Sequence, residues 1–363
     1  MRVLILANND DGLYKFRKEL LECLIKDGNE VYISLPDGDK IKFLENLGCK
    51  YIKSELDRRG LNPLMDIKLL CRYMQIIKNI KPDKVITYTI KPNIYGCFAS
   101  RIKHIKAYAN ITGLGTAFQN DGLLTKLVTI MYKAAFKRVK KVFFENKENR
   151  DVIVSKGIIE EERTHCLNGA GVNLEEYPFA DYPEDGTIRF LFIGRVMKEK
   201  GIDELFEAAE RLKSEGADVA VDVIGPFEEH YESKVNELDK AGIINYHGYQ
   251  SEVKPFIRQA HCFVLPSYHE GMANTLLESG AMGRPLITSN IHGCLEAVKD
   301  GETGYLCNVK DAEDLYIKMK QFIDLSYEDK KKMGKLSHEY VAGVFDKKKV
   351  VEETIKIIGE EHG

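Results

Sequence analysis

The most chemically informative stretch of the sequence runs from 266 to 285 and combines two acidic residues with small and polar ones. Gly271 and Ala273 would let main-chain amides approach a ligand, and Asn274 is a good N-cap for the helix predicted by the apolar pattern that follows. The first-turn amides and the helix dipole would favour an anion. This pattern predicts an anion-binding loop between a buried strand and a helix.

Two carboxylates flank the start of that helix. Glu278 follows Asn274 by one turn, which suits hydrogen bonds to a pair of ligand hydroxyls, such as a ribose diol. Glu270 precedes the helix and would point into a cleft. Alternatively, Glu278 only favours the helix start and Glu270 is a surface acid. His269 could serve the ligand site or only pack.

A second group of charged residues follows another apolar strand. The strand ends in Gly194-Arg195, and Lys200-Gly201 opens the next helix. Two positive charges at a strand's carboxyl end suit a departing diphosphate, with Arg195 as a planar fork and Lys200 as a point charge. Taken alone, the same pattern is typical of a solvated turn between a strand and a helix.

These groups must be positioned by strands and helices that alternate along the whole chain. Short Val- and Ile-rich strands separated by helical patterns predict parallel sheets with helices on both faces. We predict strands over 3–7, 30–35, 84–89, 107–111 and 142–145, then over 188–193, 219–224, 262–265 and 286–289. We predict helices over 13–26, 202–214, 233–240, 251–260 and 347–358.

The length of 363 residues is enough for two domains. The stretch 173–186 holds two prolines, five acidic residues and a glycine, and is the best linker candidate. Charge changes sign across it: residues 1–180 carry 30 basic and 22 acidic side chains, whereas 181–363 carry 23 and 34. The sequence therefore predicts a basic domain followed by an acidic one.

Several function classes are disfavoured. The eight cysteines form no C-x-x-C pair, which is typical of a reduced cytoplasmic protein, and the nine histidines show no metal-ligand spacing. No apolar run approaches the roughly 20 residues of a membrane span or a signal peptide's pattern. Asp37-Gly-Asp39 fits a turn better than a metal site. Gly113-Leu-Gly115 and Gly169-Ala-Gly171 lack the third glycine of a dinucleotide fingerprint.

The basic excess is concentrated between residues 58 and 141, where 17 basic residues face three acidic ones. A helical pattern over 124–141 places lysines on one face and apolar residues on the other. The lysine face is a solvated helix surface or a contact with an anionic membrane, worth about 1 kcal/mol per residue. Nucleic acid is disfavoured because no binding module is present. The lysines are Lys126, Lys133, Lys137 and Lys140, and the apolar residues are Leu124, Leu127, Val128, Met131 and Ala135.

The second half of the chain resembles family 4 of the glycosyltransferases, retaining nucleotide-sugar enzymes of the GT-B fold. The resemblance rests on the order and spacing of Gly194-Arg195, Lys200-Gly201, Asp222 to Gly225, His247-Gly248-Tyr249, Pro266 to Glu278 and Gly283-Arg284-Pro285. It implies an α/β fold of two doubly wound, Rossmann-like domains facing across a cleft, with the last helix crossing back. The implied domains are 1–172 plus 344–363 for the acceptor and 187–343 for the donor, joined by the linker 173–186.

The resemblance also implies roles for individual residues. Arg195 and Lys200 would hold the donor diphosphate and Glu270 would contact the transferred sugar, so these three are the predicted catalytic residues. No metal or cofactor is expected, because the two cations and the helix N-terminus would stabilise the leaving group. The implied donor-binding residues are Gly194, Gly225, Gly248, Tyr249, His269, Gly271, Met272, Ala273, Asn274, Thr275 and Glu278.

The first half is similar to the capsular and lipid-linked-oligosaccharide branch of that family. The matching segments are Tyr14-Lys-Phe16-Arg17, Tyr88 to Pro92 and Asn110 to Gly115. Many members carry a histidine where this chain has Asn110 to Thr112, so Thr112 or the Gly113 amide would take its place. The implied acceptor-side residues are Tyr14, Phe16, Arg17, Thr112 and Gly113.

The implied function is retaining transfer of a hexose or N-acetylhexosamine from a UDP-sugar to a polyprenyl-diphosphate-linked sugar. The expected place is the cytoplasmic side of a membrane, with peripheral attachment to its anionic surface and no nucleic-acid partner. Two alternatives stay open: a transferase with a soluble acceptor, and a catalytically silent nucleotide-sugar binder. The complete set of Arg195, Lys200, Glu270 and Glu278 argues against the silent binder.

Overall fold

The computed structural model describes residues 1–56, 62–114, 118 and 122–360 of the chain. It divides the chain into two compact units. Unit 1 comprises Met1–Ala170 and Lys347–Gly363, and unit 2 comprises Gly171–Asp346. Gly115 of the predicted glycine pair, and Arg58 and Asp121 of the basic segment, lie outside the described residues.

Unit 1 contains a seven-stranded parallel sheet in the order β3-β2-β1-β4-β5-β6-β7. The order reverses direction between β1 and β4, which pair directly. Sequence patterning missed the short strands β3 and β7, whose residues are only partly buried and so lack an apolar run. The strands are β1 (Arg2–Leu6), β2 (Glu30–Leu35), β3 (Lys50–Lys53), β4 (Lys84–Tyr88), β5 (Lys106–Ile111), β6 (Val139–Phe144) and β7 (Thr164–Cys166).

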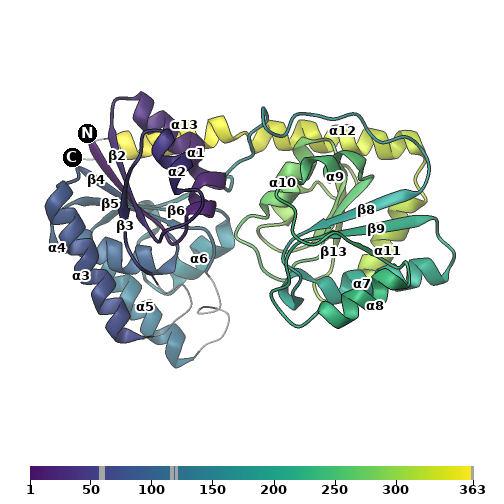
Figure 1. Cartoon of the computed structure of the whole chain (residues 1–363), viewed down its shortest axis with the longest axis horizontal. Helices are drawn as coiled ribbons and strands as arrows, with labels where there is room; N and C mark the ends of the chain where they lie inside the picture. Colours follow the sequence, from purple (N-terminus) through teal and green to yellow (C-terminus); the bar gives the residue numbers. More distant parts are fainter. Residues whose placement is uncertain (57–61, 115–117, 119–121, 361–363) are drawn as a thin grey trace. The chain divides into compact units, whose positions relative to one another are not determined.

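Helices cover both faces of this sheet, with α1, α2 and α13 on one and α3, α4 and α5 on the other (Figure 1). The last helix belongs to this unit, as predicted. Its Val350, Ile357 and Ile358 pack into the same apolar cluster as α1, and the Lys84 ammonium group donates to the Ile358 carbonyl at 2.6 Å. The helices are α1 (Asp10–Lys26), α2 (Ile41–Asn46), α3 (Pro63–Ile80), α4 (Cys97–Ile102), α5 (Leu123–Phe136), α6 (Lys147–Ser155) and α13 (Lys347–Gly359).

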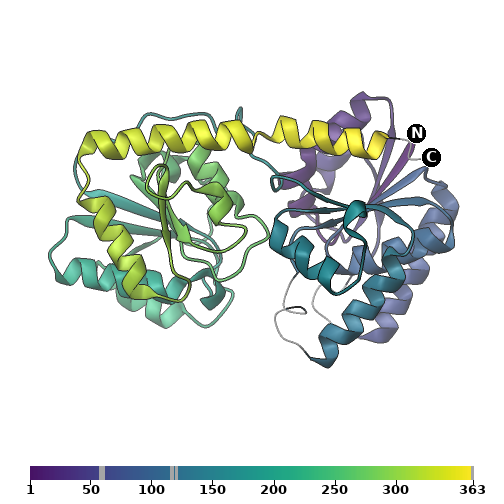
Figure 2. The same ribbon diagram turned by 180° about the vertical axis from the view of Figure 1, so that it is seen from behind.

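Unit 2 repeats this architecture with a six-stranded parallel sheet in the order β10-β9-β8-β11-β12-β13. One apolar cluster runs through the sheet and the helices on both of its faces. Figure 2, seen from behind, shows α12 and α10 on one face of this sheet and α7 and α11 on the other. The strands are β8 (Ile188–Ile193), β9 (Val219–Ile224), β10 (Asn245–Tyr246), β11 (Cys262–Leu265), β12 (Leu286–Ser289) and β13 (Gly304–Cys307). The helices are α7 (Ile202–Ser214), α8 (Glu232–Lys240), α9 (Lys254–Gln259), α10 (Asn274–Ala281), α11 (Ala312–Ile323) and α12 (Tyr327–Val344).

The predicted lysine-faced helix is partly wrong. Helix α5 ends at Phe136, so Lys137 lies at its C-cap and Lys140 lies in β6, where strand pairing with β5 overrides the helical pattern. Leu124 and Leu127 are also 41% and 55% exposed instead of buried. Only Lys126 and Lys133 of the four predicted lysines are on the helix itself.

The segment predicted as a linker, 173–186, packs within unit 2. The Tyr182 hydroxyl donates to the His261 carbonyl at 2.8 Å. The fully buried Arg284 guanidinium donates to the Asp181 carbonyl at 2.8 Å and to the Met282 carbonyl at 3.0 Å. Burial lowers the pKa of Arg284 to about 10, and these carbonyls supply the partners that a buried cation needs. Arg284 therefore ties this segment to the start of β12.

In the part of the chain that the structure describes, no helix combines the length and the apolar character needed to cross a membrane.

We expect the stability of unit 2 to fall in mild acid because of His261. Its Nδ1 accepts from the Arg189 amide at 3.1 Å and its Nε2 donates to the Glu184 carbonyl at 3.0 Å, an arrangement that requires the neutral ring. Burial lowers the pKa of His261, so below the ordinary value of about 6.5 the unfolded chain binds more protons than the folded one.

The measurement is a circular dichroism melt at pH 7.5 and 5.5, since the chain has no tryptophan. Wild-type stability should drop by up to ~1.4 kcal/mol per pH unit in this window. The less stable His261→Asn variant should lose that dependence, whereas His230→Asn, at an exposed site, should keep it. An unchanged pH dependence in His261→Asn would contradict the assignment.

Candidate functional site

The two loops that carry the predicted catalytic residues leave neighbouring strands of unit 2. Its strand order reverses between β8 and β11, which pair through Phe263 and Leu191. In doubly wound sheets, ligands bind beyond the carboxyl ends of the strands at this reversal. Gly194-Arg195 follows β8 and the loop from Pro266 follows β11, so both lie at that edge.

Lys200 and Glu270 form an ion pair at this edge. The Lys200 ammonium group contacts the Glu270 carboxylate, and the two side chains are 18% and 12% exposed. The Ser267 hydroxyl donates to the same carboxylate oxygen at 2.8 Å. The structure thus brings together two of the three predicted catalytic residues, although they lie 70 positions apart in the sequence.

A close approach of main chains holds this pair in place. Lys200 ends a 3-10 turn before α7, and Gly201 follows with a positive φ of 69°. A Cβ atom at Gly201 would lie 2.0 Å from the Pro266 carbonyl oxygen, so no other residue fits there without a shift of the main chain. The Tyr268 amide donates to the Glu199 carbonyl at 2.9 Å and its hydroxyl donates to Glu204 at 2.6 Å. The loop after β11 is therefore fixed to the start of α7.

Helix α10 begins one residue earlier than predicted. Ala273 occupies the N-cap and Asn274 is the first helical residue, so the prediction that Asn274 caps the helix is wrong. The Ala273 amide donates to the Gly293 carbonyl at 2.8 Å and is already used by the fold. The Asn274 and Thr275 amides belong to the first turn, where no carbonyl of the same helix can accept them.

The side chains around this helix start differ in what they offer a ligand. Met272 and Ala273 are 5% and 4% exposed and pack into the apolar core, so only their main chains face the loop. The Asn274 Oδ1 atom is buried and has no hydrogen-bond partner among the described residues. His269 is exposed. The helix start therefore offers main-chain amides and one unsatisfied acceptor.

Glu278 lies on α10 one turn after Asn274 and interacts with a residue that the sequence did not single out. The Tyr177 hydroxyl hydrogen-bonds to Glu278, and burial together with this carboxylate raises the pKa of Tyr177. Tyr177 belongs to the segment predicted as a linker, and no local pattern marks it as a site residue. Its position beside Glu278 depends on the packing of that segment within unit 2.

Three glycines of the predicted donor site converge from separate loops. A Cβ atom at Gly225, after β9, would lie 1.8 Å from the Gly194 carbonyl oxygen, and Gly225 has a positive φ of 147°. The Gly225 amide donates to the Gly248 carbonyl at 2.9 Å. Beside them, Tyr249 is 64% exposed. The strand ends of β8, β9 and β10 therefore form one surface of main chain with an exposed aromatic ring beside it.

Arg195 stands at the edge of this surface. Its side chain is 47% exposed, and its guanidinium lies 3.6 Å from the carboxylate of Glu228, a residue absent from the prediction. A contact of this length at this exposure adds little stability. The guanidinium is thus held loosely enough to exchange Glu228 for a ligand anion.

In unit 1, the side chain of the predicted acceptor residue Arg17 is mostly buried and already has partners within the unit. Its guanidinium pairs with Glu145 at 2.7 Å, the two side chains being 11% and 10% exposed, and lies over the Tyr88 ring. Burial raises the pKa of Glu145, and the charge of Arg17 opposes that shift. On the same helix the Tyr14 ring packs on Phe43 at 5.6 Å. Phe16 is half-buried.

Thr112 and Gly113 directly follow β5 and are half-buried. The strand-order reversal of unit 1 lies elsewhere, between β1 and β4, and β4 is followed by Thr89. Thr89 has a positive φ of 72°, which is strained for a β-branched residue, and its buried hydroxyl has no partner among the described residues. Strain and an unpaired hydroxyl at a reversal point make Thr89 a site candidate, one that the sequence pattern did not identify.

Within the described ranges, no group of three or more His, Cys, Asp or Glu side chains could hold a metal ion.

Comparisons with known proteins agree with this architecture. Residues 175–339 match the family model described as glycosyl transferases group 1, and residues 2–146 match the one described as glycosyl transferase 4-like. Together the two matches span most of unit 2 and most of unit 1. The chain therefore belongs to the glycosyltransferases that join a 4-like domain to a group 1 domain, and its fold is GT-B.

Individual relatives are distant but cover most of the chain. A Campylobacter jejuni N,N'-diacetylbacillosaminyl-diphospho-undecaprenol alpha-1,3-N-acetylgalactosaminyltransferase is 28% identical over 91% of this chain and 90% of its own. A Staphylococcus aureus capsular polysaccharide biosynthesis glycosyltransferase is 24% identical over 84% and 83%. The crystal structure of Anabaena HepE with UDP and glucose superposes with a TM-score of 0.80 at 13% identity, covering 99% of both chains.

From the Lys200–Glu270 ion pair we predict how substitutions change the free energy of unfolding of the ligand-free protein. Lys200→Met leaves the mostly buried Glu270 carboxylate without its cation and should cost about 3 kcal/mol. The double variant Lys200→Met/Glu270→Gln should lose clearly less than the sum of the two single variants. Arg195→Met, at a more exposed contact, should cost less than about 1 kcal/mol. Urea titrations measure all four, and additive losses at Lys200 and Glu270 would show that the pair is not coupled.

Proposed function

We propose that this glycosyltransferase moves a hexosyl or N-acetylhexosaminyl group from a UDP-sugar to a polyprenyl-diphosphate-linked sugar, with retention at the anomeric carbon and without a metal ion. Unit 2 binds the donor and unit 1 the acceptor. The observation that carries the proposal is the desolvated Lys200–Glu270 pair at the strand-order reversal of unit 2.

The donor diphosphate is bound by cations and amides of unit 2. Lys200 exchanges the Glu270 carboxylate for a phosphate oxygen, and Arg195 releases Glu228 to bind the diphosphate with its planar fork. The amides of Asn274 and Thr275 face the same anion at the positive end of α10. The Gly271 amide precedes them in the same loop.

The rest of the nucleotide sugar fits the remaining predicted residues. Glu278, held by the Tyr177 hydroxyl, accepts hydrogen bonds from the ribose diol. The main chains of Gly194, Gly225 and Gly248 flank the base, with Tyr249 exposed beside them. Glu270, released from Lys200, turns to the hydroxyls of the transferred sugar. His269 lies in the same loop, exposed and open to the donor.

In the transfer step, the acceptor hydroxyl oxygen forms a bond to the anomeric carbon as the bond from that carbon to the phosphate oxygen breaks. The acceptor proton passes to the departing phosphate on the same face of the sugar, which gives retention and releases UDP. Lys200, Arg195 and the start of α10 stabilise the negative charge that develops on the diphosphate. These groups take the role that a divalent cation has in other transferases.

The acceptor proposal has two supports. One is the Campylobacter jejuni relative, an N-acetylgalactosaminyltransferase that acts on N,N'-diacetylbacillosaminyl-diphospho-undecaprenol. The other is the basic excess of residues 58–141 in unit 1. On the acceptor side, Tyr14, Phe16, Arg17, Thr112 and Gly113 remain the candidates. Because the charge of Arg17 is already paired with Glu145, we propose that Arg17 holds Glu145 and Tyr88 in position on the acceptor side.

We also propose attachment to the cytoplasmic face of an anionic membrane, and the surface of α5 supports a membrane contact. Four large apolar residues of this helix are exposed. Their exposed fractions are 87% for Leu123, 64% for Ile130, 55% for Leu127 and 41% for Leu124. Exposed Lys126 and Lys133 lie on the same helix. Exposed leucines accompanied by lysines are the pattern of a helix that lies in a membrane interface. Lys137 and Lys140 add positive charge beyond its C-terminal end.

The donor-site proposal is tested by a radiolabelled transfer assay with UDP-sugars and an undecaprenyl-diphosphate-linked acceptor. Lys200→Ala should lower kcat by at least about 100-fold, because the leaving group loses its cation. The matched control Lys198→Ala, an exposed lysine two positions away, should stay near wild type. EDTA should not inhibit. Full turnover of a folded Lys200→Ala variant, or a strict Mg²⁺ requirement, would refute the proposed donor chemistry.

The membrane proposal is tested by vesicle flotation. Leu127→Gln/Ile130→Gln and Lys126→Glu/Lys133→Glu should each weaken binding to vesicles containing phosphatidylglycerol, with UDP affinity unchanged. Ile317→Gln, at a 45% exposed isoleucine of unit 2, is the matched control and should bind like wild type. Equal binding by all variants would remove the membrane contact and favour a soluble acceptor.

A further inference from the structure

A pocket of about 610 Å³ opens in unit 1, away from the edge that carries the predicted acceptor residues. It is lined by the first residues of β5 and β6, by Arg163 just before β7, and by the C-terminal ends of α4 and α5. These are the amino ends of three neighbouring parallel strands. The acceptor candidates Thr112 and Gly113 instead follow the carboxyl end of β5, at the opposite edge of the sheet.

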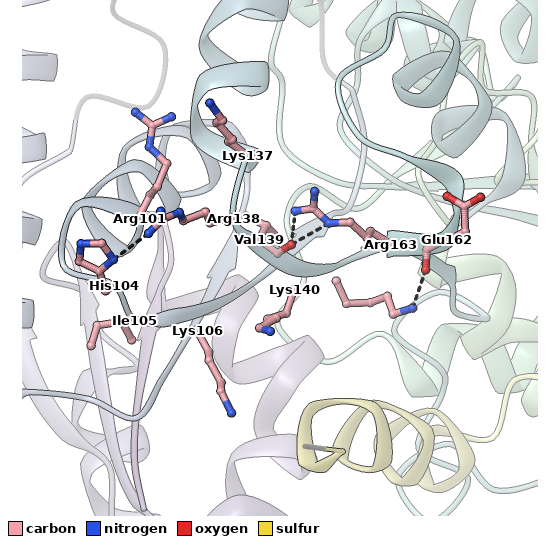
Figure 3. Close-up of a pocket in the computed structure, with 11 residues that line it drawn as sticks. Arg101, His104, Ile105, Lys106, Lys137, Arg138, Val139, Lys140, Glu162 and Arg163 are labelled. Atoms are coloured by element: carbon pink, nitrogen blue, oxygen red, sulfur yellow. Dashed lines mark hydrogen bonds between the residues drawn. The ribbon is translucent and has the colours of Figure 1, made fainter. Parts of the chain in front are cut away.

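The lining is strongly cationic. Seven of its side chains are Lys or Arg, and one, Glu162, is acidic. Figure 3 shows these side chains arriving from α4, from the turn between α5 and β6, from the starts of β5 and β6, and from the turn before β7. Among the residues that the structure describes, Arg163 pairs with Glu160 at 2.9 Å, but no ion pair involves the other six. Those six are Arg101, Lys106, Lys137, Arg138, Lys140 and Lys141.

Two of the arginines have a structural task. The Arg101 guanidinium donates to the Ala134 carbonyl, and Arg163 donates to the Phe136 carbonyl at 2.8 Å, so both satisfy the last turn of α5. Cations at a helix C-terminus also interact favourably with the helix dipole. The carbonyls at this end of α5 therefore account for Arg101 and Arg163.

The other five cations of the pocket are not needed to satisfy the carbonyls at the end of α5. Lys141 donates to the Glu162 carbonyl at 2.9 Å, and Arg138 donates to Nδ1 of the exposed His104 at 2.7 Å (Figure 3). Neither the main-chain carbonyl of Glu162 nor the imidazole nitrogen of His104 carries a formal negative charge that would offset the lysine or the arginine. Lys106 and Lys140 stand at the starts of adjacent strands. Like charges gathered this way repel one another, and a bound anion would relieve that repulsion.

We propose that this pocket binds a ligand that carries two or more phosphate groups. Lysine and arginine side chains are the usual partners of phosphate oxygens, and the volume lies within the range of about 300–1,000 Å³ for small-molecule sites, well above what one phosphate needs. The same chemistry occurs in the cardiolipin headgroup, which carries two separate phosphates, and in soluble polyphosphates. The proposal is independent of the donor site in unit 2.

The test compares two triple variants of the full chain. Lys106→Gln/Arg138→Gln/Lys140→Gln removes three pocket cations that do not hold the α5 carbonyls. Lys26→Gln/Lys42→Gln/Lys78→Gln removes three exposed lysines of unit 1 outside the pocket. Circular dichroism melts confirm that both variants fold. Isothermal titration calorimetry with inorganic tripolyphosphate at low salt then measures binding.

The pocket variant should bind tripolyphosphate at least about tenfold more weakly than wild type, and the surface variant no more than about threefold. Flotation with phosphatidylcholine vesicles containing cardiolipin, or phosphatidylglycerol at equal surface charge, distinguishes the two sources. Pocket-dependent preference for cardiolipin, blocked by tripolyphosphate, identifies a headgroup; pocket-dependent binding of tripolyphosphate alone identifies a soluble ligand. Equal losses in both variants, no binding by wild type, or tighter pocket-dependent binding of poly(U) RNA would overturn the proposal.

Discussion

The Lys200–Glu270 ion pair depends on two loops that leave neighbouring strands and come within contact distance of each other. That approach is possible because Gly201 has no side chain: a Cβ there would lie 2.0 Å from the Pro266 carbonyl. Tyr268 adds a main-chain and a side-chain hydrogen bond to the start of α7. The fold itself therefore holds the charged pair in position, and its partial burial strengthens the attraction between the two charges.

Close approaches between main chains also position the residues around the pair. Gly225 lies against Gly194 with no room for a side chain, so the loops after β8 and β9 approach closely. Tyr177 orients Glu278 from a segment that Arg284 ties to β12. Charged groups stabilise a developing charge best when they are held in position, and these close approaches supply that rigidity.

Unit 1 distributes its positive charge over structurally different places. Arg17 is neutralised by Glu145 inside the fold, and Arg101 and Arg163 satisfy the last turn of α5. Lys126 and Lys133 lie on α5 itself beside exposed leucines. Lys106, Arg138 and Lys140 gather in the pocket at the amino edge of the sheet. One compositional feature, the excess of basic residues in unit 1, thus corresponds to four separate physical arrangements.

The sequence by itself determined the alternation of strands and helices, the family, and the loops in which Arg195, Lys200, Glu270 and Glu278 lie, because apolar periodicity and local motifs are properties of neighbouring residues. Helix α7 was predicted with the bounds that the structure has. The short strands β3 and β7 were missed, and α5 was extended into β6, because pairing between strands distant in the chain decides where a marginal segment ends.

Tertiary structure alone decided which of the predicted groups are available. Lys200 pairs with Glu270, and the Ala273 amide already donates to the Gly293 carbonyl. The Tyr177 hydroxyl hydrogen-bonds to Glu278. Thr89, at the end of β4, has a strained main chain. The tertiary structure also divided the apparent lysine face between a helix and a pocket. Each of these outcomes depends on contacts between residues far apart in the sequence, and no local pattern encodes them.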